Sequence, residues 1–66
     1  MKLTVNGTEH EFAAGSTIAD VVTTLEVKTD RIATELNLSV IPKAKYGDTI
    51  LNDGDKLEIV SFVGGG

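Results

Sequence analysis

The sequence predicts an α+β domain in which one mixed β-sheet holds a single helix across its face. Apolar residues alternate along the first and last segments, a helical period occurs between them, and turn residues separate the runs. A chain of 66 residues has room for one core, and a domain of this size buries only about 60% of the surface that its unfolded chain exposes. We therefore expect one domain, 1–66, in which every apolar position matters.

The first segments predict an antiparallel hairpin. In "KLTV", Leu3 and Val5 share one face, and an extended pattern resumes in "TEHEF". Asn6 and Gly7 separate the two runs, and both residue types tolerate the positive φ of a type I′ turn, which makes Asn-Gly a strong hairpin signal.

The stretch "AAGSTIADVVTTL" changes to a helical period. An apolar stripe at i, i+3, i+4 and i+7 runs along one face: Ile18, Val21, Val22 and Leu25. Thr17 followed by Asp20 resembles a capping box, and the carboxylate suits the positive end of the helix dipole. Because the helix is short and rich in β-branched residues, packing on the sheet must stabilise it more than propensity does.

Two further extended runs follow the helix. In "RIATEL", Ile32, Thr34 and Leu36 share one face; "NLS" is a turn into "VIP", where Pro42 limits the run to a sheet edge or a strand end. We expect "KAKYGD" to be a solvated connection that includes Tyr46, and "TIL" to be a short strand or a turn.

The last run alternates after the tight turn "NDGD". In "KLEIVSF", Leu57 and Ile59 share one face, and Glu58, Val60 and Phe62 share the other. We expect the first and last strands to lie side by side in the centre of the sheet. The predicted core consists of Leu3, Val5, Phe12, Ile18, Val21, Val22, Leu25, Ile32, Leu36, Leu57 and Ile59.

Composition excludes several classes of protein. The net charge is −4 and no basic stripe occurs, which argues against nucleic acid as a partner. Without cysteine there is no disulfide framework and no thiolate metal site. No apolar stretch approaches the roughly 20 residues of a membrane span, and the start lacks the features of a secretory signal. A cytoplasmic protein without a membrane partner is the expectation.

The residues show no arrangement typical of catalysis. His10 is the only histidine and is interpreted as a surface strand residue, and no serine has a visible base partner. Asp53 and Asp55 flank Gly54, but the calcium-loop pattern is absent, which favours a simple turn and no metal site. The residues alone thus indicate a protein that is acted upon, with no cofactor of its own.

The segment "SFVGGG" offers a different chemistry. Gly64, Gly65 and Gly66 lack side chains, so a backbone of this kind fits a narrow channel and leaves the Gly66 carbonyl open to attack. Val60, Phe62 and Val63 place apolar side chains nearby, which predicts a docking patch that Gly64 and Gly65 extend. A frayed end without function is the alternative at this point.

The whole chain resembles the ThiS family, the ubiquitin-like β-grasp sulfur carriers of thiamine biosynthesis. Two blocks carry the resemblance, "NGTEHEFAAGSTIADVV" and "ELNLSVIPKAKYGDTILNDGDKLEIVSFVGGG". The specific markers are Asn37, Ile41-Pro42, Asp53-Gly54-Asp55 and Gly65-Gly66. Members often have Asn-Gly in place of Asn37-Leu38 and Trp in place of Tyr46, departures that affect local packing and leave the glycine segment intact.

The resemblance implies a protein co-substrate rather than an enzyme. A ThiF-type adenylating enzyme, similar to ubiquitin-activating enzymes, would use ATP and magnesium to adenylate the Gly66 carboxylate. Sulfur from a cysteine desulfurase would displace AMP and leave a thiocarboxylate, which a ThiG-type thiazole synthase would consume. The implied organisation is a folded body, 1–63, and a flexible tail, 64–66.

Three other functions remain open from the sequence. A molybdopterin sulfur carrier has the same fold and tail, although that family is usually longer and often has prolines before the terminal motif. The chain could also be a ubiquitin-like modifier or a carrier for another sulfur pathway. The third alternative is a β-grasp interaction domain whose glycines are inert.

Overall fold

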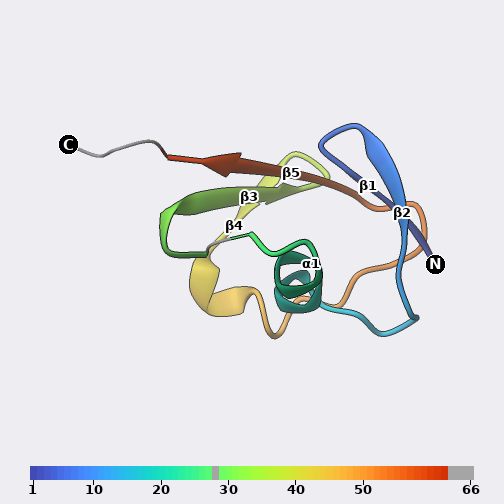
Figure 1. Cartoon of the computed structure of the whole chain (residues 1–66). Coiled ribbons are helices and arrows are strands. Elements are labelled where there is room, and N and C mark those ends of the chain that lie inside the picture. The colour runs from blue at the N-terminus through green and yellow to red at the C-terminus, as the bar shows by residue number, and fades with distance from the viewer. Residues whose placement is uncertain (28, 63–66) are drawn as a thin grey trace.

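One sheet of five strands packs across a single helix (Figure 1) in the computed structural model, which describes residues 1–27 and 29–62. The strands are β1 (Lys2–Val5), β2 (Thr8–Glu11), β3 (Ile32–Leu36), β4 (Ser39–Ile41) and β5 (Lys56–Ser61). The helix is α1 (Ile18–Thr24), and short 3₁₀ turns occupy Thr29–Arg31 and Lys43–Lys45. Among the described residues, no helix is long and apolar enough to cross a membrane.

The sheet has the order β2-β1-β5-β3-β4, with β5 in the middle. β1 and β5 run parallel, and the pairs β1–β2, β3–β5 and β3–β4 are antiparallel. The predictions of a mixed sheet and of adjacent first and last strands are therefore confirmed. β4 lies at one edge, as Pro42 directly after it predicts.

Both hairpin turns have the backbone of a type I′ turn. Asn6 and Gly7 have φ values of 49° and 81°, and Asn37 and Leu38 have φ values of 48° and 73°. The first pair fits the sequence signal. The second places a leucine, with 89% of its surface exposed, in the left-handed region that favours glycine.

α1 begins with the capping box that the sequence predicts, whereas it ends at a residue type that is unusual for a helix end. Asp20 N–H donates to Thr17 Oγ1 at 3.2 Å and Thr17 N–H donates to Asp20 Oδ2 at 2.9 Å, so the predicted capping box is confirmed. At the other end, Glu26 N–H bonds to the Thr23 carbonyl and Val27 N–H bonds to the Val22 carbonyl, which is a Schellman motif. Glu26, at φ 57°, occupies the position where glycine is usual.

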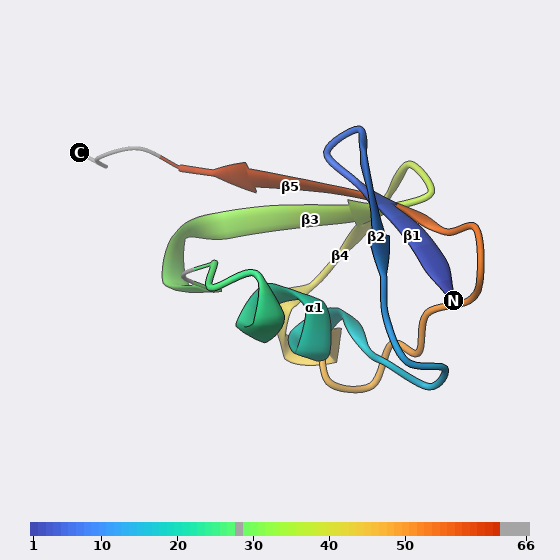
Figure 2. The ribbon, with the colours of Figure 1, turned by 45° about the vertical axis from the view of Figure 1, so that its right-hand side comes forward.

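The core lies between α1 and the sheet (Figure 2). Its buried members include seven predicted residues: Leu3, Val5, Ile18, Val21, Val22, Ile32 and Leu57. Four more predicted residues are partly buried and pack against it: Phe12, Leu25, Leu36 and Ile59. The apolar faces predicted from the alternation and the helical stripe therefore pack together.

The prediction that Tyr46 belongs to a solvated connection is wrong. Tyr46 is 5% exposed, although Lys43 and Lys45 beside it are exposed. The 3₁₀ turn reverses the chain, and the Tyr46 carbonyl accepts a hydrogen bond from Ala19 N–H at 3.1 Å, which holds this segment against the start of α1. The chain then passes Leu51, which is also buried and was missing from the predicted core.

The "TIL" segment makes one isolated bridge with the residue that caps α1. Thr17 pairs antiparallel with Ile50, whose side chain is 63% exposed, and Leu51 N–H donates to the Ser16 carbonyl at 2.9 Å. The expected short strand or turn is present only as this isolated bridge. Leu51, the next residue, is buried.

We predict that Val22→Asp unfolds the domain. Val22 is 2% exposed, so the substitution puts a charge into the core at a cost of several kcal/mol, a large share of the stability of a small domain. Thermal unfolding measured by circular dichroism tests this, with Thr23→Asp, on the exposed side of the same helix, as the matched control. Equal melting temperatures for Val22→Asp and the parent would contradict the placement of the helix.

We predict that Leu38→Gly stabilises the domain by about 1 kcal/mol, because glycine adopts positive φ without the steric cost that a Cβ brings. The exposed leucine side chain contributes little to packing. Urea unfolding measures the change, and Val40→Gly in the neighbouring strand is the control, which should destabilise. A lower free energy of unfolding for Leu38→Gly would refute this account of the turn.

Candidate functional site

β5 leads the chain toward the glycine segment and is paired unequally on its two sides. β3 pairs with it from Leu36↔Leu57 to Ile32↔Ser61. β1 pairs with it only at Thr4↔Lys56 and Val5↔Leu57. Beyond Leu57, β5 is therefore a strand with a neighbour on one side only among the described residues.

The side chain of Asn6 continues the pairing where β1 stops. Its Nδ2 donates to the Ile59 carbonyl at 3.0 Å, and Ile59 N–H donates to its Oδ1 at 2.7 Å. A side-chain amide carries both an acceptor oxygen and N–H donors, so it satisfies both backbone groups of Ile59. This bond joins residues that are 53 positions apart in the sequence.

Asn37 fixes the start of β5 from the other side. Lys56 N–H donates to Asn37 Oδ1 at 3.0 Å, and Asn37 N–H donates to the Lys56 carbonyl at 2.9 Å. Asn37 Nδ2 also donates to Asp55 Oδ1 at 3.1 Å. The strand that leads to the glycines is thus held at two points by asparagines from the two hairpin turns.

The aspartates of the "NDGD" turn have structural partners. Asp55 Oδ2 accepts Asn52 N–H at 2.8 Å, and Asp53 Oδ1 accepts Lys2 N–H at 2.6 Å. The turn interpretation of these residues is therefore confirmed. Within residues 1–27 and 29–62, no group of three or more His, Asp or Glu side chains could hold a metal ion.

Two of the predicted docking residues are exposed: Val60 in β5 and Phe62 directly after it. Val60 is 55% and Phe62 is 59% exposed, and Phe62 N–H donates to the Arg31 carbonyl at 2.7 Å, which fixes the backbone there. The other predicted site residues, Val63, Gly64, Gly65 and Gly66, lie outside the residues that the structure describes.

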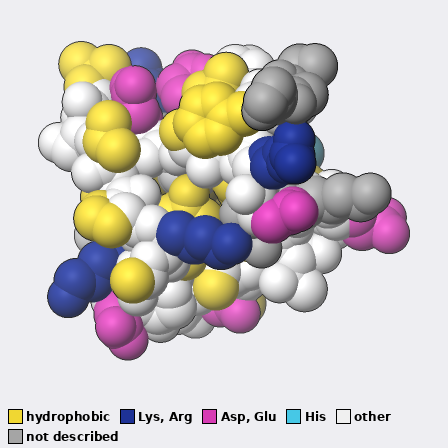
Figure 3. Space-filling view, turned by 90° about the vertical axis from the view of Figure 1, so that its left-hand side faces the viewer, with side chains coloured by type: hydrophobic (Ala, Val, Ile, Leu, Met, Phe, Trp, Pro, Cys, Tyr) yellow, Lys and Arg dark blue, Asp and Glu magenta, His cyan; other side chains and the backbone are white. Residues whose placement is uncertain are grey.

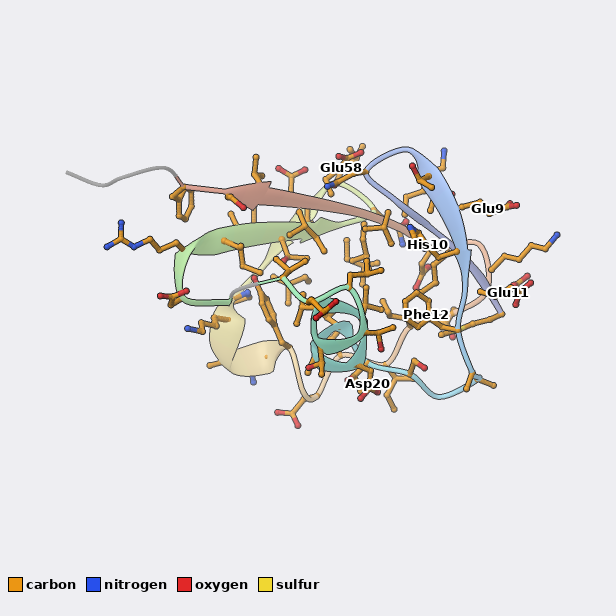
Figure 4. All side chains as sticks on the ribbon, viewed as in Figure 1. Glu9, His10, Glu11, Phe12, Asp20 and Glu58 are labelled. Carbon is orange, nitrogen blue, oxygen red and sulfur yellow. The ribbon has the colours of Figure 1, made fainter. Side chains whose placement is uncertain are left out.

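The outer face of the sheet includes residues that sequence reasoning missed. The register sets Glu35 of β3 between Val40 of β4 and Glu58 of β5, and Val40 is 69% exposed. Figure 4 shows Glu58 on the side of the sheet away from α1. The face that carries Val60 is therefore partly apolar and partly acidic. The "VIP" segment predicted an edge strand. A strand of three residues is too short for an apolar–polar alternation to show that Val40 points outward.

A hollow lies at the end of β5 from which the chain leaves. Its volume is about 600 Å³, and it is lined by Glu26, Val27, Asp30, Arg31, Ser61 and Phe62. Figure 3 looks at this end of the molecule, where hydrophobic, basic and acidic side chains lie close together. The lining comes from the residues just after α1, from the 3₁₀ turn before β3 and from the end of β5, so no local motif could have indicated it.

His10 lies on β2, away from the end of β5 (Figure 4). Its ring centroid is 6.3 Å from that of Phe12, with the planes tilted by 48°. The ring thus stacks loosely on an aromatic side chain that packs against the core. The predicted place on a strand is confirmed, and the side chain there is half-buried.

The sequence model of the ThiS family matches residues 3–66. The chain belongs to the ThiS family. In the comparison with solved structures, the crystal structure of a thiamine biosynthesis protein, ThiS, from Geobacter metallireducens superimposes with a TM-score of 0.86 at 32% identity, and all of each chain is covered. Both the family and the β-grasp fold predicted from the two sequence blocks are thereby confirmed.

This ThiS-family chain is similar in sequence to two kinds of protein, a sulfur carrier and a thiazole synthase. It is 38% identical over 50 residues to the sulfur carrier protein ThiS of Bacillus subtilis, which is 76% of each chain. It is 47% identical over all 66 residues to a thiazole synthase of Paramagnetospirillum magneticum. The chain spans about a fifth of the length of that protein.

We predict that Asn6→Gly loosens the exit of β5. Glycine keeps the positive φ of the turn but removes both hydrogen bonds to Ile59, so we expect a loss of about 1–2 kcal/mol in unfolding free energy. Hydrogen exchange of the Ile59 amide, followed by NMR, should become faster. Asn37→Gly is the matched variant: it should release Lys56 and leave Ile59 protected. Unchanged exchange at Ile59 in Asn6→Gly would show that the side chain is not what holds the strand.

Proposed function

We propose that this ThiS-family protein carries sulfur for the thiazole of thiamine on the carboxylate of Gly66. The observation that supports this most directly is that the family match runs through residue 66, so the glycine segment belongs to the family pattern. The strand that precedes it, β5, is fixed by Asn6 and Asn37. A fixed strand followed by side-chain-free residues suits a carrier that inserts its end into another protein.

The chemistry requires an activated carboxylate. An oxygen of Gly66 would attack the α-phosphorus of ATP and release pyrophosphate, giving an acyl-adenylate. Hydrosulfide would then attack the acyl carbon and expel AMP, leaving the thiocarboxylate. With a persulfide as donor, the same attack would give an acyl disulfide, and a thiol would reduce its S–S bond to release the thiocarboxylate.

The partners would supply all catalytic groups. A ThiF-type adenylating enzyme with ATP and magnesium would perform the activation, and a cysteine desulfurase would supply the sulfur. Within this chain, the body 1–63 would present the tail 64–66, and Val60, Phe62, Val63, Gly64 and Gly65 would contact the partner. The exposure of Val60 and Phe62 supports this role.

Thiazole synthase is the proposed consumer of the sulfur. In two proteins named thiazole synthase, from Paramagnetospirillum magneticum and Magnetococcus marinus, a region aligned with all of this chain occupies 20% of the polypeptide. Joining a carrier and its consumer in one chain raises their effective concentration for each other. These relatives favour thiazole formation over the molybdopterin alternative.

We predict that deletion of Gly66 nearly abolishes sulfur transfer while the body folds normally. The deletion shifts the carboxylate by roughly 3.3–3.6 Å of extended chain, and a misplacement of even about 1 Å can lower a rate by about a hundredfold. The 66-residue chain is incubated with a ThiF-type enzyme, ATP, magnesium and sulfide. Intact-mass spectrometry and fragmentation then locate the exchange of one oxygen for sulfur.

Two further variants separate docking from the acceptor chemistry. Phe62→Ala should raise KM and leave kcat close to that of the parent, because it removes a docking contact and keeps the acceptor. Gly65→Val should fail because its side chain adds bulk next to the acceptor. Thiolation of the Gly66 deletion at the rate of the parent would overturn the proposal, as would an unmodified parent tail.

A further inference from the structure

The backbone groups of β5 alternate between its two neighbours. Phe62 N–H bonds to the Arg31 carbonyl and the Lys56 carbonyl accepts Asn37 N–H, so the even-numbered residues face β3. The Leu57 carbonyl accepts Asn6 N–H, and Ile59 bonds to the Asn6 side chain, so the odd-numbered residues face β1. By this alternation, the N–H and C=O of Ser61 point to the β1 side.

No described strand occupies the β1 side of β5 at Ser61. β1 ends at Val5, and the Asn6 amide takes up the backbone groups of Ile59. Figure 2 shows β5 running on past the β1–β2 turn with no other described strand along that side. We call Ser61 and the exposed side chains of Val60 and Phe62 beside it the open edge.

The open edge lacks the usual protection of a strand edge. Edges are normally blocked by lysine, proline, a bulge or a covering loop, whereas "IVSF" contains no charge and no proline. The exposed apolar residues before and after Ser61 flank its unpaired backbone, and such a surface favours the addition of a further strand. An edge of this kind is a liability unless a partner covers it.

The surroundings of the open edge fit alternate side chains of an added strand. Successive side chains of a strand point to opposite faces of the sheet. On the outer face they would lie beside Val60. On the α1 face they would lie beside Ser61, which borders the hollow of about 600 Å³ whose other lining residues include Val27 and Arg31.

The position of Gly66 limits which protein can use this edge. Gly66 lies four residues beyond Phe62, a reach of roughly 13–14 Å in extended chain. An enzyme that reacts at Gly66 must therefore approach the end of β5 closely. Under the proposed function, thiazole synthase is such an enzyme. The two relatives named thiazole synthase include a region that aligns with this whole chain.

We propose that an extended segment of thiazole synthase pairs with the open edge at Ser61 and continues the sheet. This inference rests on the proposed function, because the glycine tail is what brings the enzyme to this end. Pairing would align the tail with the enzyme's site before the sulfur is transferred. The partner's backbone would supply affinity, and its alternate side chains would supply specificity.

Chemical synthesis of the chain with an N-methyl group on Ser61 tests the proposal. The methyl group removes the donor that faces the open side and leaves the bonds of β5 to β3 in place. The matched control carries N-methyl on Glu9 of the edge strand β2. Phe12 N–H bonds to the Met1 carbonyl, so the even-numbered residues of that strand face β1 and the N–H of Glu9 points outward.

Affinity of the unmodified carboxylate chain for thiazole synthase is measured by calorimetry. We expect N-methyl-Ser61 to bind about tenfold more weakly and N-methyl-Glu9 to bind within about twofold of the parent. The Ser61 amide of the parent should exchange more slowly with solvent in the complex. Ser61→Ala, which keeps the backbone donor, should bind as the parent does.

Equal binding of N-methyl-Ser61 and the parent would overturn the open-edge proposal. So would a loss of affinity confined to the adenylating enzyme, or a concentration-dependent dimer of the parent that N-methyl-Ser61 abolishes, because the occupant would then be a different one. Failure to thiolate Gly66 would instead overturn the proposed function. Binding of the unmodified chain and thiolation of Gly66 are separate measurements, so the two failures are distinguishable.

Discussion

The structure depends on how β5 is held by the side chains of two asparagines. The parallel contact between β1 and β5 pairs only Thr4↔Lys56 and Val5↔Leu57, which is little for the central contact of a sheet. Asn6 adds two hydrogen bonds at Ile59, and Asn37 adds one at Lys56. Each asparagine also occupies a positive-φ position in a hairpin turn, so the same residue reverses the chain and ties the turn to β5.

This arrangement separates a fixed strand from the residues that would react. Hydrogen bonds to β3 continue to Phe62, where the Arg31 carbonyl accepts its N–H. On the β1 side, the last bond among the described residues is the one made by Asn6 at Ile59. Under the proposed function, such a division would let the body set the direction of the chain ahead of the glycine segment. The open edge lies at the boundary between the two regions.

Sequence reasoning succeeded where a local pattern determines the structure. The Asn6-Gly7 turn, the Thr17–Asp20 capping box and the outward-facing Val60 and Phe62 follow from spacing alone. It failed where burial depends on distant segments: Tyr46 follows two lysines, yet it packs beneath the start of α1. The asparagine bonds to β5 were equally hidden, because Asn6 and Ile59 are 53 residues apart. The hollow combines three segments and has no sequence signature.

Three residues have an unfavourable backbone conformation or an unpaired buried group, and only one of them lines the hollow at the end of β5. Leu38 has positive φ in the β3–β4 turn, and Thr34 buries a hydroxyl that has no hydrogen-bond partner among the described residues. Each costs on the order of 1 kcal/mol, and neither lines the hollow. Glu26 is different, because its positive φ ends α1 and turns the chain so that Val27 lines the hollow beside Ser61. The strain at Glu26 therefore shapes the surface next to the open edge, where a partner would lie, whereas the other two positions affect only the stability of the body.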